Sequence, residues 1–179
     1  MLKDEDCYCP LVSDGTSIEK YFHENFDNLN FTHYLPDFEV SRLCFLDNDT
    51  KDFLIKGNET LSKINEVLEI CNCMIIELNK NSWVNWHIDA PRKGPVLNLL
   101  LTPDARSHSM FLPALYNSVN LIECKYPLHQ FVLYNTDQIH AVLNFEKPRY
   151  MFHACLERGK LDLSWDEAKN ILKSIGLVS

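Results

Sequence analysis

The sequence predicts a mainly β domain with flanking helices, built as a double-stranded β-helix, that is, a jelly roll or cupin-like barrel. The first observation is a series of strand-like segments joined by short polar or proline-bearing connections, which suit antiparallel neighbours. The second is that no helical periodicity interrupts this series. Eight antiparallel strands can form the two sheets of a jelly roll. The predicted strands lie near 73–78, 84–89, 95–102, 107–112, 119–123, 128–134, 139–144 and 148–157, and two outer strands precede them at 29–35 and 39–46.

Length and charge limit the possible classes of protein. The 179 residues fit one domain with a sizeable buried core, so we expect a single domain over 1–179 whose barrel core spans about 73–157. With 25 acidic and 17 basic residues and no basic stripe, duplex nucleic acid is not an expected partner. No signal peptide or membrane-spanning apolar run is found, so we expect a cytoplasmic protein without a membrane partner.

Three segments with apolar residues at every third or fourth position are predicted to be helices packed outside the barrel. The starts of these helices carry capping residues. Thr16 with Glu19, and Ser164 with Glu167, have the form of capping boxes, and Asn58 is a preferred N-cap residue. The helices are expected at about 17–28, 59–71 and 165–175.

The seven cysteines are predicted to be reduced thiols, because the count is odd and no export signal precedes them. The pairs Cys7–Cys9 and Cys71–Cys73 can in principle supply the four thiolates of a zinc site. Structural zinc sites, however, usually have two or more residues between paired cysteines. We therefore favour small buried apolar residues at Cys44, Cys73, Cys124 and Cys155.

A candidate metal site lies in the segment Asn85-Trp86-His87-Ile88-Asp89. In an extended chain alternate side chains point the same way, so His87 and Asp89 share a face. His140, near the start of a later apolar strand, is the best candidate for a third ligand, which completes a two-histidine, one-carboxylate site. The alternative is that both histidines are satisfied separately and that Asp89 caps a turn before Pro91.

Two further polar residues are predicted to face the barrel interior. Arg149 follows His140 by nine residues and shares its side of the strand with His153. A buried guanidinium needs an anionic partner; the alternative is an exposed arginine at a strand start. Asn98 interrupts an apolar strand, and a buried amide needs hydrogen bonds, either to a ligand or to nearby backbone.

Taken together, His87-x-Asp89, His140 and Arg149 over residues 75–157 resemble the Fe(II)/2-oxoglutarate-dependent oxygenases, particularly the aspartyl/asparaginyl β-hydroxylases and free-proline hydroxylases. The resemblance implies that His87, Asp89 and His140 hold Fe(II), and that Arg149 pairs with the far carboxylate of 2-oxoglutarate. It implies a hydroxylase that uses O2 on a small, amino-acid-like or peptidyl substrate and releases succinate and CO2.

The sequence departs from those relatives at two places. Where the β-hydroxylases have a second arginine for the cosubstrate, this chain has Val96, so Arg92, Lys93 or Asn98 is expected to replace it. The β-hydroxylases also lack the carboxylate ligand, and Asp89 brings this chain closer to the hydroxylases of free amino acids. Substrate contacts are expected from the loops 79–84, 90–95 and 113–120.

Two other functions remain open at this point. One is a cupin-like metalloenzyme that needs the metal but not Arg149, and the other is a non-catalytic jelly-roll binding module that needs neither. Trp83 and Trp86 flank the metal motif and can wall a substrate pocket, although we favour a packing role for them.

Overall fold

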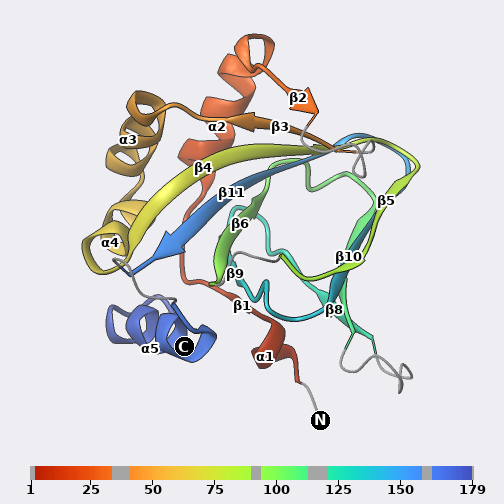
Figure 1. Ribbon diagram of the computed structural model, residues 1–179. Coiled ribbons are helices and arrows are strands. Elements are labelled where there is room, and N and C mark those ends of the chain that lie inside the picture. The colour runs from red at the N-terminus through yellow and green to blue at the C-terminus, as the bar shows by residue number, and fades with distance from the viewer. Residues whose placement is uncertain (1–2, 34–40, 90–93, 113–120, 159–162, 179) are drawn as a thin grey trace.

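The chain forms two facing β-sheets that make an open barrel, with helices packed against the outer face of the larger sheet (Figure 1). The computed structural model describes residues 3–33, 41–89, 94–112, 121–158 and 163–178. All strand pairs between described residues are antiparallel. The predicted fold class, a mainly β double-stranded β-helix with flanking helices, is confirmed, and the two sheets do not close on each other.

The larger sheet has seven strands. In spatial order they are β1 (Tyr8–Pro10), β9 (Val132–Tyr134), β6 (Val96–Leu100), β11 (Arg149–Glu157), β4 (Glu69–Leu78), β3 (Ser41–Phe45) and β2 (Thr32–His33). The smaller sheet has four strands. They are β5 (Ser82–His87), β10 (His140–Asn144), β7 (Ser107–Phe111) and β8 (Ile122–Cys124).

Each of the eight predicted core strands exists, and the chain passes repeatedly from one sheet to the other. β4, β6, β9 and β11 lie in the larger sheet, while β5, β7, β8 and β10 lie in the smaller one. The two outer strands are also present, as β2 and β3, although both are shorter than predicted. This alternation places the inner faces of the two sheets opposite each other, as a jelly roll requires.

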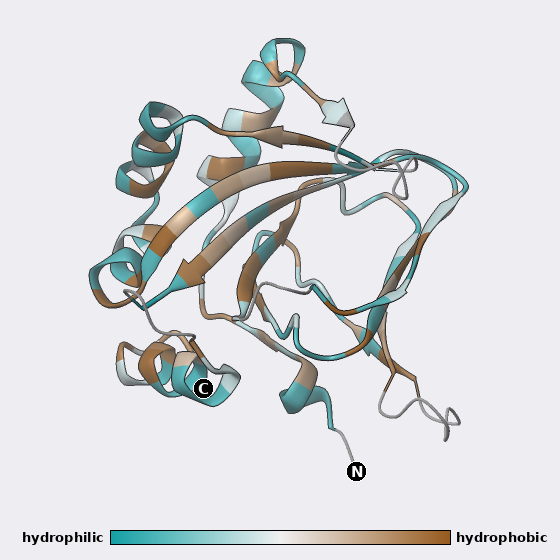
Figure 2. Cartoon of the chain, in the orientation of Figure 1, coloured by the Kyte–Doolittle hydropathy of each residue, from teal (hydrophilic) through white to brown (hydrophobic). Residues whose placement is uncertain are grey.

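The predicted helices cover the larger sheet. They are α2 (Thr16–Asn25), which continues as the 3-10 turn η1 (Phe26–Asn28), α4 (Glu59–Val67) and α5 (Trp165–Ser174). Their apolar residues join one core with the outward side chains of β4, β6 and β11. Figure 2 shows mostly apolar colouring along β3, β4 and β11 and mixed colouring on the helices. The sheet therefore has a covered outer face.

Two of the three predicted caps are confirmed. The Asn58 side chain accepts a hydrogen bond from the Leu61 amide at 2.9 Å. Ser164 and Glu167 form a complete capping box at the start of α5. These bonds satisfy amide groups that the first helical turn leaves free.

The cap predicted at Thr16 is wrong. The N-cap is Gly15, and Thr16 is the first helical residue, with its amide donating to Asp14 Oδ1 at 2.9 Å. The Gly15 amide donates to the His129 carbonyl at 2.7 Å, and a Cβ at this position would lie 2.6 Å from Leu99 Cδ2. Close packing therefore fixes the helix start at a glycine, and Glu19 instead accepts from His129 Nδ1 at 2.7 Å.

Three elements differ from the prediction in extent or were not predicted. The helix expected over 59–71 ends at Val67, because the chain enters β4 at Glu69. A helix α3 (Asn48–Gly57) was not predicted, and Asp47 caps it by accepting from the Thr50 amide at 2.7 Å. A short helix α1 (Asp4–Cys7) precedes β1.

The cysteines behave as buried thiols. All seven are free, and Cys44, Cys73, Cys124 and Cys155 are buried as predicted. Among the described residues, no cysteine belongs to a group able to hold a metal ion, so the four-thiolate zinc alternative is wrong. No described helix is long and apolar enough to span a membrane.

β11 separates the core from the barrel interior. Phe152 and Leu156 point outward into the helix-covered core, whereas Arg149 and His153 line a cavity of about 680 Å³ between the two sheets. The predicted alternation along this strand is thereby confirmed, and it determines which side chains can meet a ligand.

Candidate metal centre

His87, Asp89 and His140 come together at one end of the smaller sheet. His87 ends β5 and His140 begins β10, and the strand register places them directly opposite each other, with ring centroids 4.3 Å apart. Asp89 Oδ1 lies 3.2 Å from His87 Nε2 and 3.6 Å from His140 Nε2. One ligand atom from each residue lies within 4.8 Å of the others, so the three can hold one metal ion.

Backbone hydrogen bonds orient both imidazoles. His87 Nδ1 donates to the Asn85 carbonyl at 2.6 Å, and His140 Nδ1 donates to the Gln138 carbonyl at 2.9 Å. A carbonyl oxygen only accepts, so the proton of each neutral ring resides on Nδ1 and the Nε2 lone pair is left for a metal. Such a bond to the second ring nitrogen is usual for metal-binding histidines.

The backbone around the three residues is tied to a neighbouring turn. The Asp89 amide donates to the Thr136 carbonyl at 3.3 Å, and the Thr136 hydroxyl donates to the Gly94 carbonyl at 2.7 Å. The register of β10 against β5 shifts between His140 and Val142. A shift of this kind re-aims a side chain locally, and here it occurs next to His140.

Electrostatics favour the ligand forms of Asp89 and His140. Burial alone would raise the pKa of Asp89, but the neighbouring His87 and His140 hold it below its ordinary value, and Asp89 in turn raises the pKa of His87. Burial lowers the pKa of His140, which is only 5% exposed. An ionised carboxylate beside a neutral imidazole is the combination that a divalent metal binds.

Arg149 is buried in the same cavity, 3% exposed, so the alternative of an exposed arginine is wrong. Its Nη2 donates to Ser109 Oγ at 3.0 Å, and its guanidinium carbon lies 5.4 Å from the ring centre of Tyr126. The Nε atom is buried without a hydrogen-bond partner. No carboxylate of the described residues forms an ion pair with Arg149, and a buried guanidinium is costly without an anion.

Tyr134 is a second unsatisfied group in this part of the cavity. Its hydroxyl is buried without a partner, and its ring packs edge-on against His140 with centroids 5.2 Å apart. Burial raises the pKa of Tyr134 well above its ordinary value, so the hydroxyl stays protonated. Two orphaned donors, Arg149 Nε and the Tyr134 hydroxyl, therefore lie in one cavity with the candidate metal ligands, which suits an oxygen-rich anion.

Asn98 lines the cavity as expected but uses a partner that was not predicted. It is 3% exposed, and its Oδ1 accepts from His153 Nδ1 at 2.9 Å. The two residues face each other across β6 and β11. The hydrogen bond of Asn98 thus goes to a neighbouring side chain rather than to local backbone.

The other sequence candidates fall into three groups. Val96 is fully buried and lines the cavity, so the strand position that carries an arginine in the resembled relatives supplies no charge here. Arg92 and Lys93 lie outside the described residues. Trp83 is 53% exposed, and neither Trp83 nor Trp86 is among the described residues that line the cavity.

Ser109, Tyr126 and Tyr134 were not identified from the sequence. Each lies in a predicted strand or next to one, but strand periodicity cannot decide which face of a short strand meets a ligand. The usable signal was a hydroxyl in an otherwise apolar strand, as at Tyr134 in Phe131-Val132-Leu133-Tyr134, because a buried hydroxyl needs a partner.

No protein-family profile and no curated protein sequence matches this chain. Solved structures do match. The prolyl-4-hydroxylase of Pseudomonas putida has a TM-score of 0.57 at 14% identity, over 80% of this chain and 85% of the other. HygX of Streptomyces hygroscopicus, solved with nickel, 2-oxoglutarate and hygromycin B, has a TM-score of 0.61 at 11% identity, over 84% and 83%. The viral collagen prolyl hydroxylase of Paramecium Bursaria Chlorella virus-1, in its 2-oxoglutarate complex, has a TM-score of 0.55 at 11% identity, over 86% of this chain and 96% of the other.

The fold is that of the 2-oxoglutarate–Fe(II) oxygenases. At 10–14% identity this likeness concerns the course of the backbone, and the solved structures are not confined to one branch. They include prolyl hydroxylases and an epimerase from nogalamycin biosynthesis. The chemistry of this chain has to be argued from its own cavity.

Proposed function

We propose that this protein is an Fe(II)- and 2-oxoglutarate-dependent dioxygenase that hydroxylates a small or peptidyl substrate. One observation carries the proposal. A single cavity contains three metal-ligating side chains and a buried arginine that has no carboxylate partner among the described residues. The fold supports it, because solved proteins with this fold include one with bound nickel and 2-oxoglutarate and one in complex with 2-oxoglutarate.

In this proposal, His87, Asp89 and His140 would hold Fe(II). Two neutral imidazoles and one carboxylate would leave coordination positions for further ligands. The hydrogen bonds from His87 and His140 to backbone carbonyls fix the ring orientation before the metal arrives. When bound, Fe(II) and 2-oxoglutarate supply the oxidation of the substrate by O2, and 2-oxoglutarate ends as succinate and CO2.

Arg149 is proposed to bind the far carboxylate of 2-oxoglutarate. Its guanidinium presents a planar fork that matches a carboxylate, and Ser109 holds one arm of that fork at 3.0 Å. The orphaned Tyr134 hydroxyl can donate to the same anion. Apolar walls around Arg149 strengthen this pairing, because they exclude water and lower the local dielectric.

Asn98 is proposed as a contact for the metal-side carboxylate of 2-oxoglutarate. Its Oδ1 already accepts from His153, which leaves the amide nitrogen as a donor. His153 thereby fixes the orientation of the Asn98 side chain. In the resembled β-hydroxylases a second arginine has this role, but Val96 stands at that position here. Asn98 is proposed to take over the role.

For the substrate, an amino-acid-like molecule or a peptide is the class we propose. Asp89 as a third ligand favours relatives that act on free amino acids over the β-hydroxylases without a carboxylate ligand. Solved enzymes with this fold include a prolyl hydroxylase in complex with a peptide fragment and HygX with the antibiotic hygromycin B. Both small and peptidyl substrates are therefore compatible with this architecture.

A cupin-like metalloenzyme that does not use 2-oxoglutarate is the main alternative. It requires the three metal ligands but gives no reason for a buried guanidinium with an orphaned Nε. A non-catalytic binding module would require neither feature. The role of Arg149 thus distinguishes the oxygenase from the cupin-like enzyme. Metal binding distinguishes both of these enzymes from the binding module.

The test is an anaerobic titration. The purified chain is loaded with Fe(II), 2-oxoglutarate is added, and the metal-to-ligand charge-transfer absorption is recorded. Oxygen is then admitted while amino acids and peptides are screened for substrate-stimulated succinate release. The proposal expects one Fe(II) per chain and a saturable charge-transfer band. Fe(II) binding without such a band would favour the cupin-like alternative.

A further inference from the structure

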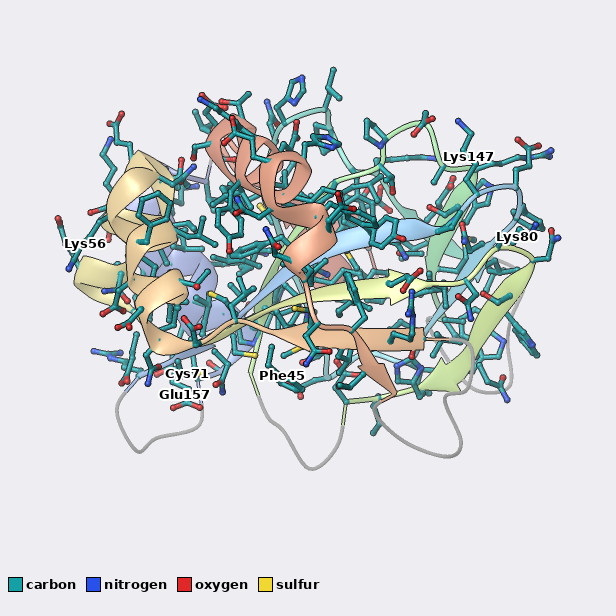
Figure 3. The ribbon with its side chains drawn as sticks, turned by 90° about the horizontal axis from the view of Figure 1, so that it is seen from above. Phe45, Lys56, Cys71, Lys80, Lys147 and Glu157 are labelled. Carbon is teal, nitrogen blue, oxygen red and sulfur yellow. The ribbon has the colours of Figure 1, made fainter. Side chains whose placement is uncertain are left out.

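The cavity is longer than a metal and its cosubstrate require. Along β11, alternate residues from Arg149 to Glu157 line it, so it follows the full length of the strand. Figure 3 places the labelled Phe45, Cys71 and Glu157 on one side of the molecule, away from Lys80 and Lys147. His153, at the middle of this strand, lines the same cavity as the three candidate metal ligands.

We call the part of the cavity formed by Phe45, Cys71, Asn72, Cys155 and Glu157 the distal end. From His153 to Glu157 the strand advances four residues, which is roughly 13 Å at about 3.3 Å per residue. Arg149 lies at the opposite end of β11. The distal end is therefore free for a molecule other than 2-oxoglutarate.

A β-bulge builds the distal end. The register of β11 against β4 shifts between Cys155 and Leu156, which leaves Cys71 as an extra residue beside Asn72. In a bulge two consecutive residues oppose one on the partner strand, so an additional side chain turns to that face. Both Cys71 and Asn72 accordingly line the cavity. Cys71 Sγ donates to the Cys155 carbonyl at 3.4 Å, which fixes its direction.

Glu157 carries the one unbalanced charge among the described residues that line the cavity. The lining contains one cation, Arg149, and two carboxylates, Asp89 and Glu157. In the proposed complex the charges of Fe(II), Asp89, Arg149 and doubly ionised 2-oxoglutarate cancel. The charge of Glu157 remains, and the acidic surface of a chain with net charge −8 adds to its potential.

Glu157 is exposed to solvent, and its cross-strand neighbour does not neutralise it. Its cross-strand partner is Glu69, a second carboxylate, and like charges placed opposite each other are unfavourable. No ion pair within the described part of the chain involves either residue. Cys71 is a neutral thiol, whose pKa is raised chiefly by its hydrogen bond with Cys155 and also by Glu157, so it supplies no charge to balance that carboxylate.

Apolar side chains form the wall between the metal centre and the distal end. Leu43, Met74 and Ile76 line it from β3 and β4. Phe45, at the end of β3, is 53% exposed although it lines the cavity. An aromatic side chain left half in water at the edge of a cavity is suited to contact a ligand.

We propose that the distal end receives the ammonium or guanidinium group of an elongated substrate whose apolar body lies along β3 and β4. The cation would bind Glu157, which is separated from His153 by four residues of extended strand, roughly 13 Å at about 3.3 Å per residue. This inference rests on the proposed function, which gives the other end of the cavity to the metal and 2-oxoglutarate. A free proline is too short to reach both places, whereas a long-chain amine or a basic peptide is long enough.

The test compares three probes with the same apolar chain. The full chain, loaded anaerobically with Fe(II) and 2-oxoglutarate, is titrated calorimetrically with n-octylammonium, n-octanoate and n-octanol. Octylammonium should bind most tightly. Glu157→Gln should weaken octylammonium by about three- to fivefold, as for a partly exposed ion pair, and leave octanol unchanged. Glu157→Lys should reverse the preference in favour of octanoate.

The matched control is Glu146→Gln. Glu146 is an exposed carboxylate that pairs with Arg106 and does not line the cavity, so the same loss of charge there should leave all three affinities unchanged. A further comparison distinguishes a basic peptide from a free amine as the source of the cation. It uses a capped alanine peptide with one lysine and the same peptide with norleucine in place of the lysine. Tighter binding of the lysine peptide than of octylammonium identifies a basic peptide, and the reverse order identifies a free amine.

Equal affinities for octylammonium and octanol, or an unchanged octylammonium affinity in Glu157→Gln, would overturn the inference. The charge-transfer band of the same sample, recorded first, tests the proposed function independently. If the band is absent, the probe series is repeated on the metal-free chain, where the expected order of affinities is the same because Glu157 is distant from the metal ligands.

Discussion

His87 and His140 occupy directly opposite positions on β5 and β10, and each ring donates from Nδ1 to the carbonyl of the residue two positions earlier in the sequence. The two imidazoles therefore present Nε2 to the same point before any metal is bound. Asp89 Oδ1 lies within 3.6 Å of both Nε2 atoms. This symmetry makes the two histidines equivalent in their expected effect on metal binding.

We expect His87→Ala and His140→Ala each to abolish stoichiometric Fe(II) binding, because two remaining ligands hold an open three-ligand site poorly. Asp89→Ala should weaken binding by a smaller amount. The measurement is metal content after anaerobic loading and desalting. His23→Ala is the control, because His23 is exposed on α2 away from the cavity. One full equivalent of Fe(II) in both histidine variants would contradict the assignment of the metal site.

Arg149→Ala is expected to weaken 2-oxoglutarate binding by more than roughly tenfold, because an unpaired carboxylate in a buried site costs on the order of 2–5 kcal/mol. Arg149→Lys should restore only part of the affinity, since an ammonium keeps the charge but loses the two parallel hydrogen bonds. Fe(II) content should not change. Titration of the charge-transfer band measures the affinity.

The control for this experiment is Arg106→Ala, which removes an exposed arginine paired with Glu146. Its 2-oxoglutarate affinity should equal that of the unmodified chain. If Arg149→Ala also titrates normally, the metal centre stands, but the cosubstrate assignment loses its main support and a cupin-like enzyme becomes the better interpretation.

Much of this architecture was predictable because period-two alternation and turn residues are local properties. All eight core strands and the caps at Asn58 and Ser164 were predicted for that reason. The inward orientation of Arg149 was also predictable, because it follows from the alternation along β11 once the outward side chains Phe152 and Leu156 are assigned to the core.

The features that were missed depend on contacts between distant residues. Thr16 has a suitable side chain for a cap, but the approach of Leu99 and the His129 carbonyl to Gly15 fixes the helix start one residue earlier. The extra residue at Cys71 follows from the register between β4 and β11, which is set by both strands together. Sequence periodicity within one strand contains no information on that register.

Asn58→Ala should destabilise the protein by roughly 1–3 kcal/mol, because it removes a helix cap together with buried hydrogen bonds. The Asn58 side chain is 4% exposed. It accepts from the Leu61 amide and donates to the Asp14 carbonyl at 2.8 Å and to Ser17 Oγ at 2.9 Å. Urea denaturation measures the loss, and Fe(II) content should be unaffected because Asn58 lies outside the barrel.

Asn170→Ala is the matched control for that measurement. Asn170 is exposed on α5, where alanine has a better helix propensity than asparagine. The free energy of unfolding of the Asn170→Ala protein should therefore equal that of the unmodified protein or be slightly higher. A loss at Asn170 as large as that at Asn58 would show that the effect of Asn58→Ala is not due to its hydrogen bonds.

The last prediction concerns the reactivity of Cys71, which is partly exposed but has a raised pKa. The main cause is its hydrogen bond with Cys155, followed by burial and by the hydrogen bond and charge of Glu157. A raised pKa keeps the group a neutral thiol, and only the thiolate reacts with iodoacetamide. Cys71 should therefore be alkylated slowly at mildly alkaline pH, more slowly than an unperturbed cysteine in a short peptide.

Glu157→Gln removes one of the causes, so the pKa of Cys71 should fall and its thiolate fraction at fixed pH should rise. Alkylation of Cys71, followed by mass spectrometry of its peptide, should become faster and its pH profile should move to lower pH. Cys9 serves as an internal reference, because its raised pKa is due mainly to burial and owes nothing to Glu157. An unchanged Cys71 profile would mean that the Glu157 carboxylate does not face the thiol, and the distal end of the cavity would then lack the anionic group on which recognition of a cationic substrate depends.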